Sequence, residues 1–110
     1  MEKVTLFYLE RPDIKISMQL YFSEKGQLYF DGYDTGKLVE EAWGNSEYEY
    51  SYTVESDEVN KFYQAFNLKD GDKSGLLKAM KNEFSVDKAY SLFGKFMTAH
   101  NIKYERFTWS

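Results

Sequence analysis

An acidic, glycine-containing segment at residues 70–75 is the part of the sequence that most resembles a metal-binding loop. Its order, Asp-Gly-Asp-Lys-Ser-Gly, puts oxygen ligands at the first, third and fifth positions of an EF-hand calcium loop and glycine at the sixth, with the aliphatic Leu77 at the eighth. The twelfth position, which should carry a bidentate glutamate, is Lys81. A lysine there opposes tight calcium binding, so we interpret the segment as a polar turn and assign no metal ligand.

Paired carboxylates could support acid–base catalysis. Glu47 and Glu49 share one face of a predicted strand at a separation of about 7 Å, which is compatible with glycoside hydrolysis. Catalysis also requires a pocket that shifts the two pKa values apart, whereas glutamates on an open sheet face are ordinarily solvated. His100 falls at the end of a predicted helix, where it can cap the last carbonyls, and no serine lies in a nucleophile elbow. The sequence therefore assigns no catalytic residue and predicts a non-enzyme, with a small carboxylate-dependent hydrolase as an alternative.

The composition excludes several other kinds of site. The chain has 110 residues, no cysteine and one histidine, which excludes disulfide frameworks, thiolate zinc sites and imidazole metal clusters. Aromatic residues make up 19% of the sequence, enough for one substantial core. The apolar run near the N-terminus ends at Glu10 and Arg11, and no stretch approaches the roughly 20 apolar residues of a membrane span. We expect a single domain over residues 1–110, in the cytoplasm, with no cofactor and no membrane contact.

Charge is distributed unevenly along the chain. Residues 31–60 contain nine acidic residues against one lysine, a net charge of −8, whereas residues 61–110 contain nine basic and five acidic residues, a net charge of +4. Such a field favours a basic partner near the acidic segment and disfavours nucleic acid there. The tyrosines of residues 47–54 also alternate with acids, whereas stacking of single-stranded nucleic acid requires aromatics among bases.

Alternation with a period of two dominates the first half of the chain. It predicts strands over residues 4–9, 14–22, 28–31 and 47–54, the second and third of which form a hairpin. In the last of these strands, tyrosines face one side while Glu47, Glu49, Ser51 and Thr53 face the other. Residues 37–43 could add one or two helical turns that end at Gly44.

Helical periodicity replaces alternation after residue 55. We predict one helix capped by Ser56, a second after the loop at residues 69–74, and a third capped by Ser85 that stops at Asn101. Residues 102–109 return to β character. This order predicts an α+β fold, ββββαααβ, with an antiparallel sheet of about five strands and helices packed on one face. The last strand should rejoin the sheet because its aromatic residues would otherwise remain exposed.

The segment from Asp31 to Glu49 combines carboxylates with aromatic residues. Trp and Tyr are favoured anchors at protein interfaces, and acids around them select a positively charged counterpart. The predicted partner-binding residues are Asp34, Glu40, Glu41, Trp43, Glu47 and Glu49. The alternative is that the aromatic residues fill the core and the acids only solubilise the surface.

Two segments carry a resemblance to known proteins. Residues 32–50, Gly-Tyr-Asp-Thr-Gly-Lys-Leu-Val-Glu-Glu-Ala-Trp-Gly-Asn-Ser-Glu-Tyr-Glu-Tyr, and residues 101–107, Asn-Ile-Lys-Tyr-Glu-Arg-Phe, are similar to small bacterial α+β proteins, some of which accompany polymorphic toxins as immunity proteins. The similar order of elements covers most of the chain, whereas the specific signature covers these two segments. The resemblance implies inhibition of a cognate toxin by direct binding, and an acidic, aromatic surface would suit a basic, nuclease-type toxin.

We therefore expect a non-enzymatic domain that binds a basic, toxin-like protein. Besides the carboxylate-dependent hydrolase, the sequence leaves open a regulatory domain that binds a small ligand or calcium. The oligomeric state is open as well, since an uncovered edge at the first or last strand could pair two copies.

Overall fold

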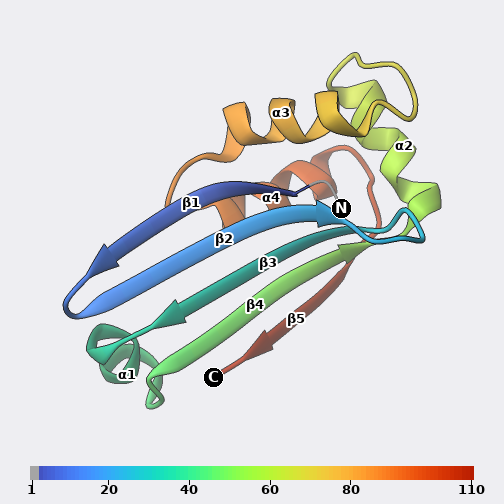
Figure 1. Cartoon of the computed structure of the whole chain (residues 1–110). Coiled ribbons are helices and arrows are strands. Elements are labelled where there is room, and N and C mark those ends of the chain that lie inside the picture. Colours follow the sequence, from blue (N-terminus) through green and yellow to red (C-terminus); the bar gives the residue numbers. More distant parts are fainter. Residues whose placement is uncertain (1–2) are drawn as a thin grey trace.

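The computed structural model describes residues 3–110 and contains one five-stranded antiparallel sheet. Its strands are β1 (Lys3–Arg11), β2 (Ile14–Phe22), β3 (Leu28–Thr35), β4 (Glu47–Val54) and β5 (Glu105–Trp109). Its helices are α1 (Lys37–Trp43), α2 (Ser56–Ala65), α3 (Lys73–Phe84) and α4 (Ala89–Ala99). The strands lie side by side in chain order (Figure 1). Between β4 and β5 the chain leaves the sheet to form α2, α3 and α4, and β5 then returns to pair with β4. The predicted α+β fold is confirmed.

Alternation within the strands separates two faces of the sheet. Leu20 of β2 lies opposite Phe30 of β3, which lies opposite Tyr52 of β4, and all three are buried. The neighbouring row, which contains Gln19 and Asp31, points to the other side and is not buried. Because successive side chains of a strand point to opposite faces, the buried apolar residues of β2, β3 and β4 collect on one side.

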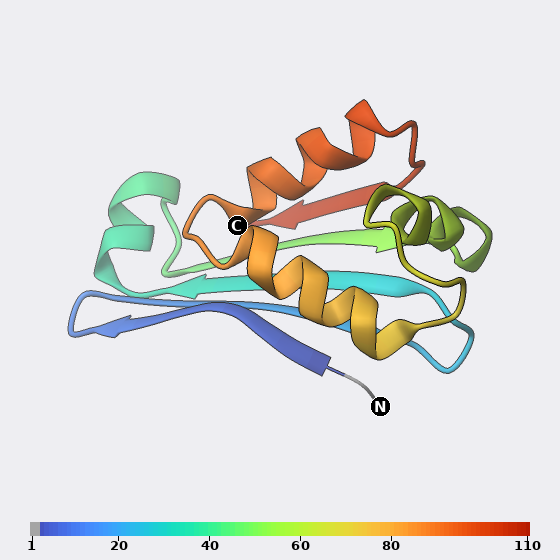
Figure 2. The same cartoon turned by 90° about the horizontal axis from the view of Figure 1, so that it is seen from above.

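Helices α2, α3 and α4 lie on the apolar side, as predicted (Figures 1 and 2). Phe30 of β3, Phe62 of α2 and Phe93 of α4 are fully buried, and the ring centroid of Phe93 lies 5.3 Å from that of Phe30 and 5.5 Å from that of Phe62. Burial of each such ring contributes about 1.5–3 kcal/mol, so this aromatic cluster holds the helices to the sheet. None of the helices within residues 3–110 has the length and apolar character needed to cross a membrane.

Two helix starts differ from the prediction. α2 begins at Ser56, and Glu55 occupies the N-cap position without a side-chain cap. α4 begins at Ala89, so the prediction that Ser85 caps this helix is wrong. Ser85 instead ends α3, where its hydroxyl donates backward to the carbonyl of Lys81. Helix α4 ends at Ala99, close to the predicted stop, and Asn101 adopts the left-handed conformation (φ 57°).

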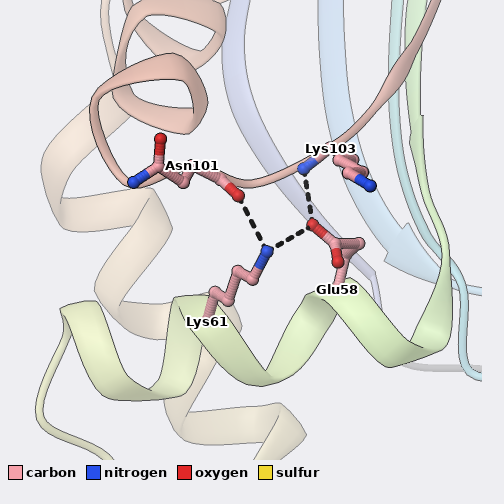
Figure 3. A network of polar contacts seen from close by, with 4 residues as sticks. All are labelled: Glu58, Lys61, Asn101 and Lys103. Carbon is pink, nitrogen blue, oxygen red and sulfur yellow. Dashed lines mark hydrogen bonds and ion pairs between the residues drawn. The ribbon is translucent and has the colours of Figure 1, made fainter.

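A polar network fixes the connection from α4 to β5 (Figure 3). Glu58 of α2 accepts hydrogen bonds from the Lys61 ammonium at 2.9 Å and from the backbone N–H of Lys103 at 2.6 Å. The Lys61 ammonium also donates to the carbonyl of Asn101 at 2.8 Å. These contacts tie α2 to the segment that leads into β5, and so help to orient that strand.

β5 rejoins the sheet as predicted, but not for the predicted reason. It pairs antiparallel with β4, with Phe107 opposite Ser51 and Trp109 opposite Glu49. Phe107 is nevertheless 56% exposed and Trp109 is 47% exposed. The expectation that return to the sheet would bury these rings is wrong, because both point to the face that carries no helices.

Candidate functional site

The face of the sheet opposite helices α2, α3 and α4, which we call the open face, carries acidic and aromatic side chains side by side. The strand register brings the outward residues of β3, β4 and β5 into adjacent rows. We call these residues the acidic patch: Tyr29, Asp31, Tyr33, Thr35, Glu47, Glu49, Ser51, Thr53, Glu105, Phe107 and Trp109. Directly opposite side chains in such rows are about 4.5–5.5 Å apart at Cβ, so the members of the patch are neighbours.

The acidic patch contains carboxylates without a compensating cation. Its acids are Asp31, Glu47, Glu49 and Glu105, and it includes no lysine or arginine. Two lysines of the open face lie on the neighbouring strands. Lys3 of β1 lies over the ring of Tyr21 at 5.4 Å, and Lys15 of β2, directly opposite Thr35 of the patch, lies over the ring of Tyr8 at 5.9 Å. Arg106 of β5 points to the opposite face, because it lies in the row of Tyr52 and contacts the ring of Tyr90.

Two tyrosine hydroxyls orient the carboxylates. Tyr33 donates to Glu47 at 2.7 Å, and Tyr21, from the neighbouring β2, donates to Asp31 at 2.6 Å. The hydrogen bond to Glu47 is the main cause that raises the pKa of Tyr33, whereas burial, assisted by Asp31, raises the pKa of Tyr21 to about 12. Both tyrosines therefore stay neutral donors near pH 7, and carboxylates alone set the charge of the patch.

A hollow of about 410 Å³ lies at the centre of the open face. Small residues from three strands, Ser17, Gly32 and Ser51, line it together with the larger Tyr33 and Phe107. Asp31, Glu49, Gln19 and Tyr50 complete the lining. The short side chains of Ser17 and Ser51 stand beside the rings of Tyr33 and Phe107 and leave this space, which opens to solvent. Gly32 and Tyr50 line it although their row points to the helix-bearing side. Glu47 does not line it, so the two glutamates once considered for catalysis do not share this hollow.

Large apolar groups are exposed around this hollow. Tyr33 is 40% exposed, and the rings of Phe107 and Trp109 are exposed to a greater extent. Single exposed apolar residues are common, but several together beside a sheet edge are characteristic of an interaction surface. β5 is also an edge strand, since β4 is its one neighbour in the sheet formed by residues 3–110.

The six residues predicted to bind a partner are divided between the two sides of the sheet. Glu47 and Glu49 belong to the acidic patch. Asp34 lies opposite Ile16 and Tyr48, in a row that points to the helix-bearing side. Asp34 is half-buried and accepts a hydrogen bond from Tyr50 at 2.5 Å. Burial raises the pKa of Asp34, and the hydrogen bond from Tyr50 partly opposes this shift.

The remaining three predicted residues belong to α1, at one end of the sheet (Figure 1). Trp43 stacks on Tyr48 with 4.6 Å between ring centroids, so it too lies on the side of Asp34. Glu40 and Glu41 are exposed on the helix surface. The structure therefore brings Glu47 and Glu49 together with Asp31, Glu105, Phe107 and Trp109, and separates them from Asp34 and Trp43.

The loop that resembles an EF-hand start has a structural role. Asp72 occupies the N-cap position of α3, and its carboxylate accepts a hydrogen bond from the backbone N–H of Gly75 at 3.0 Å. The ammonium of Lys73 lies over the ring of Phe22 at 5.4 Å. Across residues 3–110, no three or more acidic, histidine or cysteine side chains are grouped so that they could hold a metal ion.

Comparison with protein-family models, curated proteins and solved structures finds no match to this chain.

Proposed function

We propose that this chain is a non-enzymatic protein-binding domain whose acidic patch binds a basic protein. The observation that carries the proposal is the composition of the patch, in which carboxylates stand beside exposed aromatic rings and form no ion pair within residues 3–110. Complementary potentials speed association and select against wrong partners. A surface of this kind repels nucleic acid and favours a protein with clustered lysines or arginines.

Aromatic side chains supply the affinity in this proposal. Binding that covers Phe107 and Trp109 removes apolar surface from water, at about 25 cal/mol for each Å². Trp and Tyr are over-represented among the residues that dominate protein interfaces. Trp109 lies opposite Glu49, so an anchor and a charge that gives specificity stand side by side.

The resemblance of residues 32–50 and 101–107 to immunity proteins suggests the class of partner. In this reading the chain neutralises a basic, nuclease-type toxin in the cytoplasm by covering its positive surface. The part of the first segment that reaches the acidic patch includes Tyr33, Glu47 and Glu49, and the second segment includes Glu105 and Phe107. Both segments thus contribute to one surface, which supports the proposal.

Photo-crosslinking in the source cells tests the proposal. A photoreactive amino acid replaces Tyr33 in one variant and Leu92 in the control, two residues that are each 40% exposed but lie on opposite sides of the molecule. We expect a basic protein to crosslink from position 33 and not from position 92. Equal crosslinking from both positions, or no crosslinked protein from position 33, would contradict the proposal.

A further inference from the structure

The hollow in the open face has features that go beyond the general charge of the acidic patch. Its volume of about 410 Å³ falls within the range of about 300–1,000 Å³ typical of ligand sites, which is ample for one side chain. Two of its lining residues, Tyr33 and Phe107, offer aromatic rings that are 40% and 56% exposed. Two others, Asp31 and Glu49, offer carboxylates, and no lining residue is a cation.

The carboxylates that line the hollow differ in how they are already bound. Asp31 accepts the hydroxyl of Tyr21, which leaves it further lone pairs. The carboxylate of Glu49 makes no hydrogen bond or ion pair with any residue in the range 3–110. Glu49 also lies directly opposite Tyr33, so a charged group that reaches Glu49 must pass beside an aromatic ring.

We propose that this hollow receives an arginine side chain of the protein partner. This inference rests on the proposed function and names the chemistry by which the partner is recognised. A guanidinium group stacks on aromatic faces and presents several N–H donors in one plane, which suits rings and carboxylates that line the same hollow. The hydroxyls of Ser17 and Ser51 and the amide oxygen of Gln19 add neutral acceptors for donors that the carboxylates do not reach.

Lysine fits the same hollow less well. Its ammonium is a compact, strongly hydrated charge without a planar face, so it gains less from Tyr33 and Phe107 and cannot form a bidentate pair with Glu49. Charge attraction alone would favour arginine and lysine equally, so tighter binding of arginine than of lysine is the result that distinguishes this site.

A matched pair of peptides tests the inference without the natural partner. One peptide carries a single arginine between blocked glycines, and the other carries lysine in the same position. Both are titrated into the isotope-labelled full chain, and backbone amide shifts are followed by NMR. We expect the arginine peptide to shift the amides of Gly32 and Ser51 and to bind at least about fivefold more tightly than the lysine peptide.

Three variants locate the response. Glu49→Gln should abolish the preference for arginine, whereas Glu41→Gln, which removes an exposed carboxylate from α1, should leave it intact. Phe107→Ala removes one ring from the hollow and should reduce the preference, and the exposure of that ring means that folding is retained. Equal binding of the two peptides, or shifts confined to residues outside the hollow, would overturn the inference.

The outcome is separable from that of the proposed function. A basic protein that crosslinks at position 33, combined with equal binding of the two peptides, would leave the protein-binding function standing and remove the arginine site. Selective binding of the arginine peptide without any crosslinked protein would leave the arginine site standing and remove the protein-binding function.

Discussion

Gly94 lies where α4 passes over Tyr52 of β4. A Cβ at position 94 would stand 2.3 Å from the hydroxyl oxygen of Tyr52. That hydroxyl donates to the backbone carbonyl of Tyr90 at 3.0 Å, and the two tyrosine rings stack with 4.2 Å between centroids. The ring cannot move aside without losing both contacts, so glycine is required although it disfavours the helix.

A double-mutant cycle tests this explanation. Gly94→Ala should lower the free energy of unfolding by up to about 2 kcal/mol, because overpacking costs about 1–3 kcal/mol and the gain in helix propensity returns only about 1 kcal/mol. In a Tyr52→Phe background the obstructing oxygen is gone, so the same change should cost much less or stabilise the protein. Chemical denaturation of the four proteins measures the coupling. Additive effects would show that Tyr52 is not the reason for the glycine.

Among the contacts between secondary-structure elements, those of the Glu58 carboxylate hold the connection between α4 and β5. The backbone N–H of Lys103, and then the ammonium of Lys61, lower the pKa of Glu58 below its ordinary value of 4.5. A carboxyl whose pKa is lower in the folded state contributes stability above its unfolded pKa, and this stability is lost as the pH falls through the folded pKa.

We therefore predict that Glu58→Gln destabilises the protein near neutral pH and that the difference from the native sequence shrinks below a pH of about 4.5. Asp57→Asn is the matched control, because Asp57 lies in the same first turn of α2 and shares any interaction with the helix dipole. Denaturant unfolding at several pH values measures both differences. A difference that stays constant down to about pH 3 would contradict the role given to Glu58.

Removal of a phenylalanine ring should cost much more stability on the helix-bearing face of the sheet than on the open face. Phe93→Ala removes a fully buried ring of α4 and should cost about 3–5 kcal/mol. Phe107→Ala removes an exposed ring of β5 and should cost well under about 1 kcal/mol. Thermal or denaturant unfolding compares the two variants. A large cost for Phe107→Ala would mean that this ring stabilises the fold and is not kept for a partner.

The elements themselves were largely predictable from local patterns. Alternation fixed the ends of β2 and β4 because a half-buried strand must change face at every residue. The start of α4 was not predictable in the same way, because the hydroxyl of Ser85 can either cap a helix that follows it or donate to a carbonyl of the helix that precedes it. The second arrangement occurs, and α4 begins only at Ala89, where it can present Ala89 and Phe93 to the core.

The candidate site was only partly predictable at the scale of the whole molecule. Glu47 and Glu49 followed from alternation, whereas Asp34 was grouped with them by sequence proximity although its side chain points to the other face. Phe107 and Trp109 were expected to be buried. They share their alternation with Glu105, which signals one common face, but the pairing of β5 with β4 is a long-range contact that local pattern does not reveal.

The polarised charge of the chain becomes a polarised surface through this pairing. β4 lies within the acidic segment of residues 31–60, and β3 begins just before this segment and ends inside it. β5 comes from the basic C-terminal half, but it adds Glu105 to the open face while Arg106 points to the opposite face. Association with a basic protein should consequently depend on this face and not on the net charge of −4.

The most direct test of this dependence on the acidic patch uses the basic protein captured at position 33. Its dissociation constant is measured over a range of salt concentrations. Two charge-reversal pairs alter the net charge equally: Glu47→Lys with Glu49→Lys in the acidic patch, and Glu40→Lys with Glu41→Lys on α1. We predict that the first pair weakens binding at least about tenfold and flattens its salt dependence, whereas the second changes the constant less than about threefold. Equal weakening by the two pairs, or unchanged binding by the first, would contradict the assignment of the acidic patch as the binding surface.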